Sequence, residues 1–140
     1  MDSKDFKCVM VIDETLPTGI IANTAGIMGI TLGKFIPEAV GCAVADKDGR
    51  MHLGIIEYPV PVLKASKERL MELREMLYDP AFSELTVVDF SDVAQSCNTY
   101  DTYIQKAASV SGADMTYLGI ALCGNKKLVN RLTGSLPLLR

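Results

Sequence analysis

Apolar runs of strand length alternate with helical patterns along the chain. Residues 6–12 (FKCVMVI) are mostly apolar, which is typical of a strand buried on both faces of a sheet, and residues 116–122 form a second such run. Strands that alternate with helices predict one α/β domain over residues 1–140. We expect a three-layer sandwich, with a mixed sheet of about four strands and helices on both faces.

Turn and cap signals place the elements between these two runs. The Asp-Gly pair within Asp46–Arg50 predicts a hairpin that joins strands at residues 42–45 and 51–56. Ser66 is the expected cap of a helix with an apolar stripe made of Leu70, Leu73 and Leu77. The remaining predicted elements are an extended segment at residues 58–63, a strand at 85–88, and a helix from Thr99 or Tyr100 to Ala108.

The first predicted helix has an unusual face of small residues. Thr18 is its expected cap, and the helix runs to about Gly33. Ala22, Gly26, Gly29 and Gly33 follow one another at spacings of four, three and four, which places them on one face. Glycine costs up to about 1 kcal/mol in a helix interior, so this face predicts close packing on the sheet or on a partner helix.

The end of the chain has a distinctive order of elements. The strand-like run 116–122 leads to Gly124, then to a basic helix and the tail Leu132–Leu139 (LTGSLPLL). This order resembles the end of type 2 peptidyl-tRNA hydrolases, where a strand, a glycine turn and a short helix run into a Thr-Gly-x-Leu tail. The resemblance implies the peptidyl-tRNA hydrolase type 2-like fold.

The hydrolase family also has a characteristic helix start, which corresponds here to residues 19–28. The family's lysine, glutamine and histidine positions hold Ile20, Thr24 and Ile27, and Asp89 is the counterpart of its aspartate. Because three of these positions hold other residues, a divergent peptidyl-tRNA hydrolase that acts on a nucleic-acid-linked substrate is the alternative function and not the leading one.

A closer resemblance is to an uncharacterised bacterial family of unknown function with the same fold. The shared features are an Asp after the first strand, a helix of small residues rich in Asn and Thr, a helix within residues 89–114, and a closing Leu-Thr-x-x-Leu-x-Leu-Leu tail. This resemblance implies a fold and no particular reaction.

Charge is unevenly distributed along the chain. The net charge is -3 and the pI is about 5.1, which argues against a nucleic-acid-binding protein. The residues after Asp114 carry +4, which leaves -7 for the rest. The four cations are Lys126, Lys127, Arg131 and Arg140. They are interpreted as matching the dipole at a helix C-terminus, and an anion site is the alternative.

The cysteines indicate a reducing compartment. Cys8, Cys42 and Cys123 lie in or beside apolar strand-like runs, where reduced cysteine packs as a small hydrophobe. The four cysteines form no C-x-x-C pair and the only histidine, His52, is expected on an exposed strand, so no metal or cofactor is predicted. The apolar residues 20–33 are too short and glycine-rich to span a bilayer, and no signal peptide is visible. These features predict a cytoplasmic protein.

Polar residues gather after two of the predicted strands. The first group contains Asp13, Thr18, Asn23 and Thr24, and the second contains Asp89, Thr99, Tyr100 and Asp101. Ligands in open α/β sheets bind beyond the carboxyl ends of strands, so we expect one pocket between the two groups. It would bind a small molecule or an anion, and a hydrolase activity stays open. The structural alternative is that these residues only cap helices and form turns.

Self-association as a homodimer is also predicted. The glycine face of the first helix and an extended edge at Pro59–Leu63 both offer apolar contact surfaces. The alternative is that the glycine face packs only on its own sheet. Because the chain is acidic overall, little or no tRNA binding is expected at physiological salt.

Overall fold

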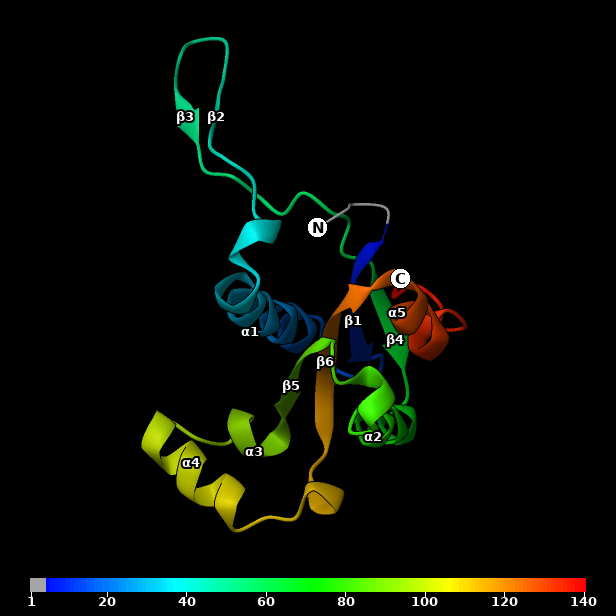
Figure 1. Ribbon diagram of the computed structural model, residues 1–140. Coiled ribbons are helices and arrows are strands. Elements are labelled where there is room, and N and C mark those ends of the chain that lie inside the picture. Colours follow the sequence, from blue (N-terminus) through cyan, green and yellow to red (C-terminus); the bar gives the residue numbers. More distant parts are fainter. Residues whose placement is uncertain (1–4) are drawn as a thin grey trace.

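Four strands form the central sheet of the computed structural model, which describes residues 5–140 (Figure 1). Their order across the sheet is β4-β1-β6-β5. β1 is parallel to β4, whereas β6 is antiparallel to both of its neighbours, β1 and β5. The mixed sheet of about four strands is thus confirmed. The strands are β1 (Phe6–Asp13), β4 (Val62–Ala65), β5 (Thr86–Ser91) and β6 (Tyr117–Asn125).

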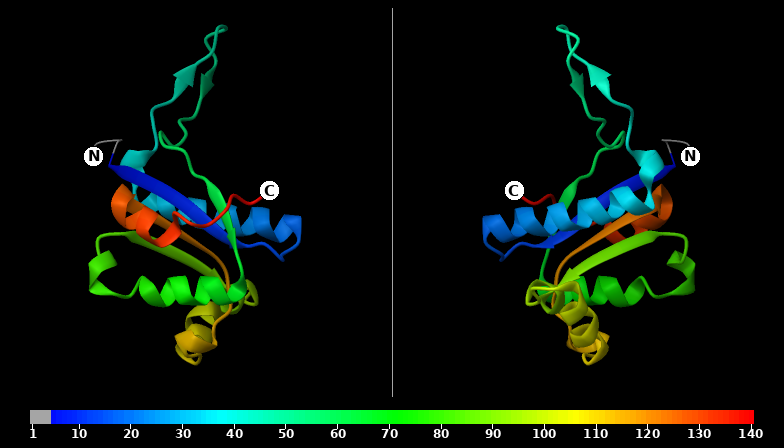
Figure 2. Two further views of the ribbon diagram at one scale, coloured as in Figure 1. Left: turned by 90° about the vertical axis from the view of Figure 1, so that its right-hand side faces the viewer. Right: turned by 90° about the vertical axis from the view of Figure 1, so that its left-hand side faces the viewer.

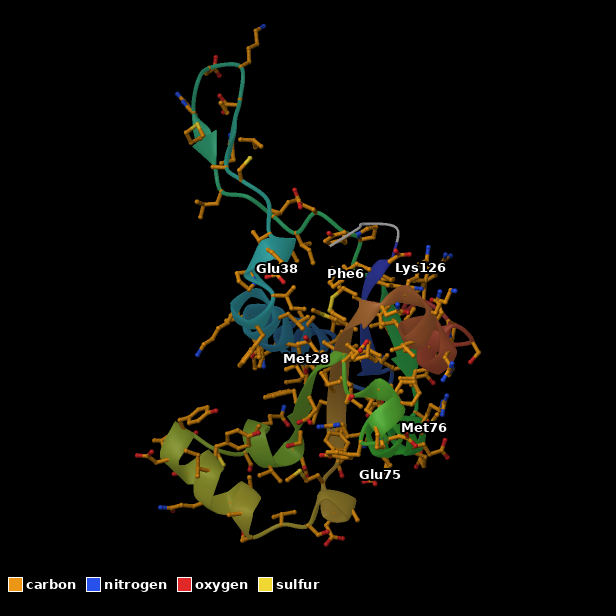
Figure 3. All side chains as sticks on the ribbon, viewed as in Figure 1. Phe6, Met28, Glu38, Glu75, Met76 and Lys126 are labelled. Atoms are coloured by element: carbon orange, nitrogen blue, oxygen red, sulfur yellow. A yellow bond between two sulfur atoms is a disulfide. The ribbon has the colours of Figure 1, made fainter. Side chains whose placement is uncertain are left out.

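Helices cover both faces of this sheet, as expected (Figure 2). One face packs against α1 (Thr18–Phe35), where Met28 is fully buried between the helix and the sheet (Figure 3). The other face packs against α2 (Lys67–Met76) and α5 (Lys126–Thr133). Each face therefore has its own apolar core, because neighbouring residues of a strand point to opposite sides.

The ends of the helices follow the predicted signals in α2 but not in α1. The Ser66 hydroxyl accepts a hydrogen bond from the Arg69 N–H at 3.1 Å, so the predicted cap is confirmed. In α1 the capping position is Pro17 rather than Thr18, and the Pro17 carbonyl accepts from the N–H groups of Ile20 and Ile21 at 3.0 Å. The prediction for Thr18 was wrong by one residue because proline can enter a helix by its fixed φ, without a side-chain cap.

A hairpin at residues 41–57, here called the arm, projects from the body of the molecule (Figures 1 and 2). Its strands, β2 (Val44–Ala45) and β3 (Met51–His52), are shorter than predicted because an isolated hairpin has no core to pack on. The side chains of β2 and β3 are exposed (Figure 3), whereas Ile56 at the base of the arm packs against the core on the α1 side. His52 is exposed, as predicted, and its Nε2 lies 2.8 Å from Asp46 Oδ2, a hydrogen bond that lowers the pKa of that carboxyl.

The C-terminal tail covers the β4 edge of the sheet. Leu63 pairs antiparallel with Leu138, and the Lys64 N–H donates to the Pro137 carbonyl at 2.9 Å. The edge at Pro59–Leu63 is therefore partly occupied and is not the open contact surface expected from the sequence. At the opposite edge, beside β5, lie α3 (Asp92–Gln95) and α4 (Tyr100–Ala108). Short 3-10 turns at Pro37–Ala39, Pro80–Phe82 and Gly112–Asp114 complete the chain.

The glycine face of α1 does not pack closely on the sheet. A Cβ added at Gly26 or Gly33 would meet nothing within 4 Å, and one added at Gly29 would meet only the Met10 methyl at 3.7 Å. The prediction of close packing on the sheet was therefore wrong for these glycines, whereas packing on a partner helix stays a prediction. The close approach is instead at Gly119 of β6, where a Cβ would lie 2.9 Å from the Thr24 methyl. Helical spacing shows which residues share a face, but not how far that face stands from its neighbour.

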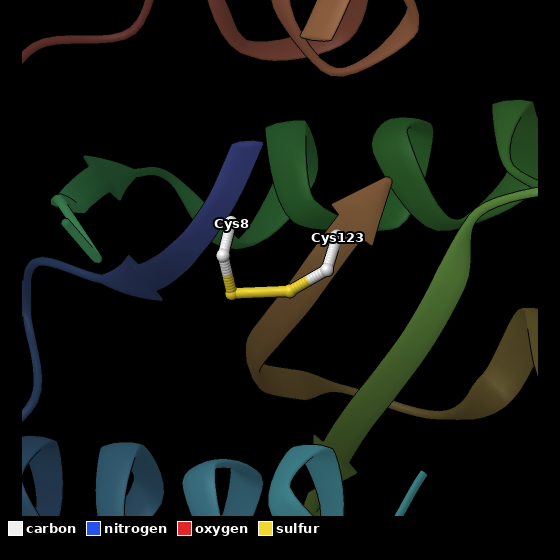
Figure 4. The surroundings of a disulfide bond; sticks show 2 residues. All are labelled: Cys8 and Cys123. Atoms are coloured by element: carbon white, nitrogen blue, oxygen red, sulfur yellow. A yellow bond between two sulfur atoms is a disulfide. The ribbon is translucent and has the colours of Figure 1, made fainter. Parts of the chain in front are cut away.

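Cys8 and Cys123 form a disulfide between β1 and β6, on the side of the sheet that faces α1 (Figure 4). They are directly opposite in the strand register, with Cα atoms 4.2 Å apart. The prediction that both are reduced was wrong because they are 115 residues apart, so only strand pairing reveals their proximity. Cys42 and Cys97 are free thiols. Cytoplasmic location stays a prediction, and the reduced state of Cys8 and Cys123 no longer supports it.

No helix within residues 5–140 is both long and apolar enough to cross a bilayer.

Candidate functional site

The carboxyl ends of β1 and β5 lie at the same end of the sheet, as the sequence argument required. Both strands run antiparallel to β6, which lies between them. Asp13 ends β1 and Ser91 ends β5. Two strand spacings, about 10 Å, therefore separate these ends.

A cavity of about 440 Å³ lies beside the end of β5, between α1 and α4; we call it the β5 pocket. Three of the predicted residues, Asp89, Thr99 and Tyr100, line it together. The other polar lining residues are Thr31, Cys97, Asn98 and Tyr103. Tyr103 was not predicted, although it follows Tyr100 by three positions and so shares its helix face. The complete lining is Ile27, Thr31, Val88, Asp89, Phe90, Ala94, Cys97, Asn98, Thr99, Tyr100 and Tyr103.

Asp89 is held by a cation from the neighbouring helix. Its Oδ2 accepts a hydrogen bond from Arg74 Nε of α2 at 2.8 Å, and the two side chains are only 24% and 15% exposed. The Arg74 guanidinium also lies 4.1 Å from the centre of the Tyr78 ring. No hydrogen bond of the described residues uses Oδ1 of Asp89, so one carboxylate oxygen remains available.

Tyr103 is the second polar group of interest in the β5 pocket. Partial burial raises its pKa above the ordinary value of 10.0, and the negative charge of Asp89 raises that pKa further. Its ring contacts that of Tyr100 edge to face, with centroids 5.6 Å apart. The Tyr103 hydroxyl is therefore protonated at neutral pH and can donate a hydrogen bond.

The prediction that Thr99 caps a helix is confirmed, since it is the capping residue of α4. Its Oγ1 accepts from the Thr102 N–H at 3.1 Å. Cys97 donates its thiol proton to the Val93 carbonyl at 3.2 Å. In the described part of the chain, no hydroxyl or thiol of this pocket is hydrogen-bonded to a carboxylate or imidazole. The β5 pocket therefore lacks the paired nucleophile and base that covalent catalysis uses.

Asp13 belongs to a different environment. It is buried, and its Oδ1 accepts from the N–H of Thr15 at 2.9 Å and from the Thr15 hydroxyl at 2.7 Å. Its Cα partner is Ala65, which packs in the core on the α2 side of the sheet. Because Ile12 points towards α1, strand alternation turns Asp13 towards α2.

The other members of the first group do not line the β5 pocket either. Thr24 lies on the inner side of α1 and is buried against Gly119 of β6, whereas Thr18 and Asn23 are exposed. Asp101 lies in the exposed first turn of α4 and does not line the pocket. The structure thus brings together Asp89, Thr99 and Tyr100, and it does not join them to the first group in the single pocket expected from the strand ends.

Two buried oxygens lack a hydrogen-bond partner among residues 5–140: Oδ2 of Asp13 and Oγ1 of Thr24. They lie on opposite faces of the sheet, so they do not form a joint site. Within the same residues, no group of three or more His, Cys, Asp or Glu side chains is arranged to hold a metal ion.

The basic residues of α5 were only partly explained by the helix dipole. Lys126 and Lys127 are the first two residues of the helix, at its positive end, so the dipole interpretation was wrong for them. Arg131, in the last turn, does fit it. The amides at the helix start are already occupied, because Oδ1 of Asn125 accepts from the Lys127 N–H at 2.9 Å. An anion site here remains an untested alternative.

Comparison with known proteins identifies the family. The family model described as "Protein of unknown function (DUF2000)" matches residues 6–140. A solved structure of a protein of unknown function from Agrobacterium tumefaciens strain C58 is similar in fold, with a TM-score of 0.85 and 16% identity over 96% of this chain and 97% of that one. No curated protein matches the chain. The expectation of an uncharacterised family is confirmed: the chain belongs to the DUF2000 family of proteins of unknown function.

Proposed function

We propose that the protein binds a small organic molecule in the β5 pocket. The observation that supports this most is a cavity that the Tyr103 side chain, with its raised pKa, lines together with Asp89, Thr99 and Tyr100, beside apolar wall residues such as Val88 and Phe90. A titratable group whose pKa is shifted, as that of Tyr103 is, in a concave site of a few hundred Å³ is typical of ligand-binding sites. Asp89, Thr99 and Tyr100 are thus retained as candidate ligand-binding residues, and Asp13, Thr18, Asn23, Thr24 and Asp101 are not assigned to this pocket.

The lining favours a neutral or cationic ligand over an anion. Asp89 is the only charged side chain among the described residues that line the pocket, and it is negative. Its carboxylate is bound by Arg74 on the α2 side of the sheet, so the Tyr103 hydroxyl is the hydrogen-bond donor that the pocket offers to a ligand. Apolar walls and the Tyr100 ring provide contact for an aromatic or aliphatic part of the ligand. A ligand with a hydrogen-bond acceptor on a planar apolar body fits these groups.

Ligand binding is tested by thermal-shift screening of neutral and cationic aromatic metabolites, followed by calorimetry on variants. We expect Tyr103→Phe to weaken the binding of a screening hit by about 3- to 10-fold, because a hydrogen bond between neutral groups contributes about 0.5–1.5 kcal/mol. Asp89→Asn, which removes the only charge among the described lining residues, should weaken the binding of a cationic hit by a similar factor. Asp101→Asn removes the same charge from an exposed neighbouring position and should leave the affinity within about twofold.

Circular dichroism would show whether Asp89→Asn still folds, since this variant also loses the ion pair with Arg74. Tyr103→Phe leaves that ion pair intact, so it tests the pocket separately. A hit whose affinity is unchanged in both variants would place its site elsewhere and refute the proposal.

The fold itself is proposed to be that of the type 2 peptidyl-tRNA hydrolases. The support is the mixed sheet together with the tail Leu132–Leu139, which passes from α5 to the β4 edge. Hydrolysis of a nucleic-acid-linked substrate is the second candidate function. The exposed Lys126 and Lys127 favour it, and the acidic net charge of -3 weighs against it. Its family's lysine, glutamine and histidine positions hold other residues, so ligand binding without catalysis is the preferred function.

We propose that the protein forms a homodimer through the arm. Leu53 and Ile55 are 90% and 79% exposed on a hairpin that projects from the body, and such apolar surface is typical of an interface. Leu53→Asp should convert a wild-type dimer into a monomer in sedimentation experiments at micromolar concentration. Lys47→Asp, at the arm's polar tip, should leave the dimer unchanged. A monomeric wild-type protein would contradict the proposal.

A further inference from the structure

A second cavity, of about 340 Å³, lies on the other side of α1 from the β5 pocket; we call it the apolar pocket. β1 and β6 form its floor, α1 forms one wall, and the residues at the base of the arm form its rim. The two cavities have no lining residue in common. The described residues that line the apolar pocket include no charged side chain and no hydrogen-bonding polar side chain, and the Cys8–Cys123 disulfide lies in its floor.

Two glycines of α1 keep this cavity open. Gly29 and Gly33 both line it, and an added Cβ would find open space at Gly33 and only one ordinary contact at Gly29. Neither has a positive φ, so neither is required by the backbone. Alanine would favour the helix more than glycine does at both positions. The structural effect of these glycines is therefore free volume in the pocket, obtained at a cost in helix stability.

We infer that the apolar pocket binds a neutral, apolar small molecule. A charged or strongly polar group would lose its hydration there without gaining a hydrogen bond, which excludes such ligands on energetic grounds. The volume is about twice that of an apolar cavity of about 150 Å³ that holds benzene, so a bicyclic aromatic molecule or a medium-length acyl chain fits. Val40, which is 43% exposed at the rim, marks where the pocket meets the surface.

The probe for this pocket is N-phenylnaphthylamine, a neutral dye whose fluorescence rises in apolar surroundings. We expect Gly33→Leu to weaken dye binding by about tenfold or more because the new side chain fills the cavity, with Gly33→Ala intermediate. Gly26→Leu makes the same exchange on the same helix but outside the pocket, so its affinity should remain within about twofold of the wild type. All three variants should melt at a temperature no lower than the wild type, since each replaces a helix glycine.

The charge preference is tested with anilinonaphthalene sulfonate, an anionic relative of the dye, which should bind about tenfold more weakly. Equal loss in Gly26→Leu and Gly33→Leu, or no binding to the wild type, would overturn the inference. Dye binding that emerges only in Leu53→Asp would also overturn it, because the arm of a second copy would then be the occupant of the pocket. If Gly33→Leu does not fold, Gly33→Ala decides the test, because an affinity for the dye equal to that of the wild type would overturn the inference.

Discussion

Removing the Cys8–Cys123 disulfide is expected to lower the free energy of unfolding by about 4–5 kcal/mol. The bond closes a loop across 115 residues, and in the chain-entropy model a loop of about 100 residues corresponds to about 4.7 kcal/mol. Urea unfolding of the oxidised wild type and of Cys8→Ala/Cys123→Ala measures the difference. The same loss should follow when the wild type is unfolded in the presence of a reductant.

Cys42→Ala/Cys97→Ala is the matched control, because it also removes two cysteines but leaves the disulfide in place. Its unfolding midpoint should be close to that of the wild type and should still fall on reduction. Thiol titration of the oxidised, denatured wild type should detect two of the four cysteines. Four reactive thiols, or a midpoint insensitive to reductant, would show that this bond does not form.

Leu73→Ala is expected to lower the free energy of unfolding by about 2–5 kcal/mol. Leu73 is 1% exposed on the inner side of α2, in the core that this helix forms with the sheet. Truncation removes buried methyl groups and leaves a cavity, because close-packed neighbours relax only partly. Urea denaturation followed by circular dichroism gives the value.

Met76→Ala, one turn later on the same helix, is the matched control. Met76 is 42% exposed and lies away from the sheet (Figure 3), so its truncation should change stability by less than about 1 kcal/mol. Similar losses in the two variants would mean that α2 does not pack on the sheet by the face described here.

The candidate site was only partly visible in the sequence. The polar run that begins at Asp89 pointed to Asp89, Thr99 and Tyr100, and these do line one pocket, although Asp89 lies within β5 and not after it as predicted. Asp13 was predicted to lie with them because ligands in α/β sheets bind beyond the carboxyl ends of strands, and the carboxyl ends of β1 and β5 do lie at the same end of the sheet. Its side chain faces α2, however, because strand alternation and sheet order together decide the face on which a residue lies.

By itself, the sequence determined the elements whose signals are local. The apolar run of β1, the leucine stripe of α2 behind its Ser66 cap, and α4 behind Thr99 all depend on periodicity and on hydrogen bonds between near neighbours. Only the tertiary structure decided the pairing of Cys8 with Cys123 and the distance at which α1 stands from the sheet. Both depend on contacts between residues far apart in the chain, and the same glycine spacing is compatible with a tight contact or, as found here, with an open cavity.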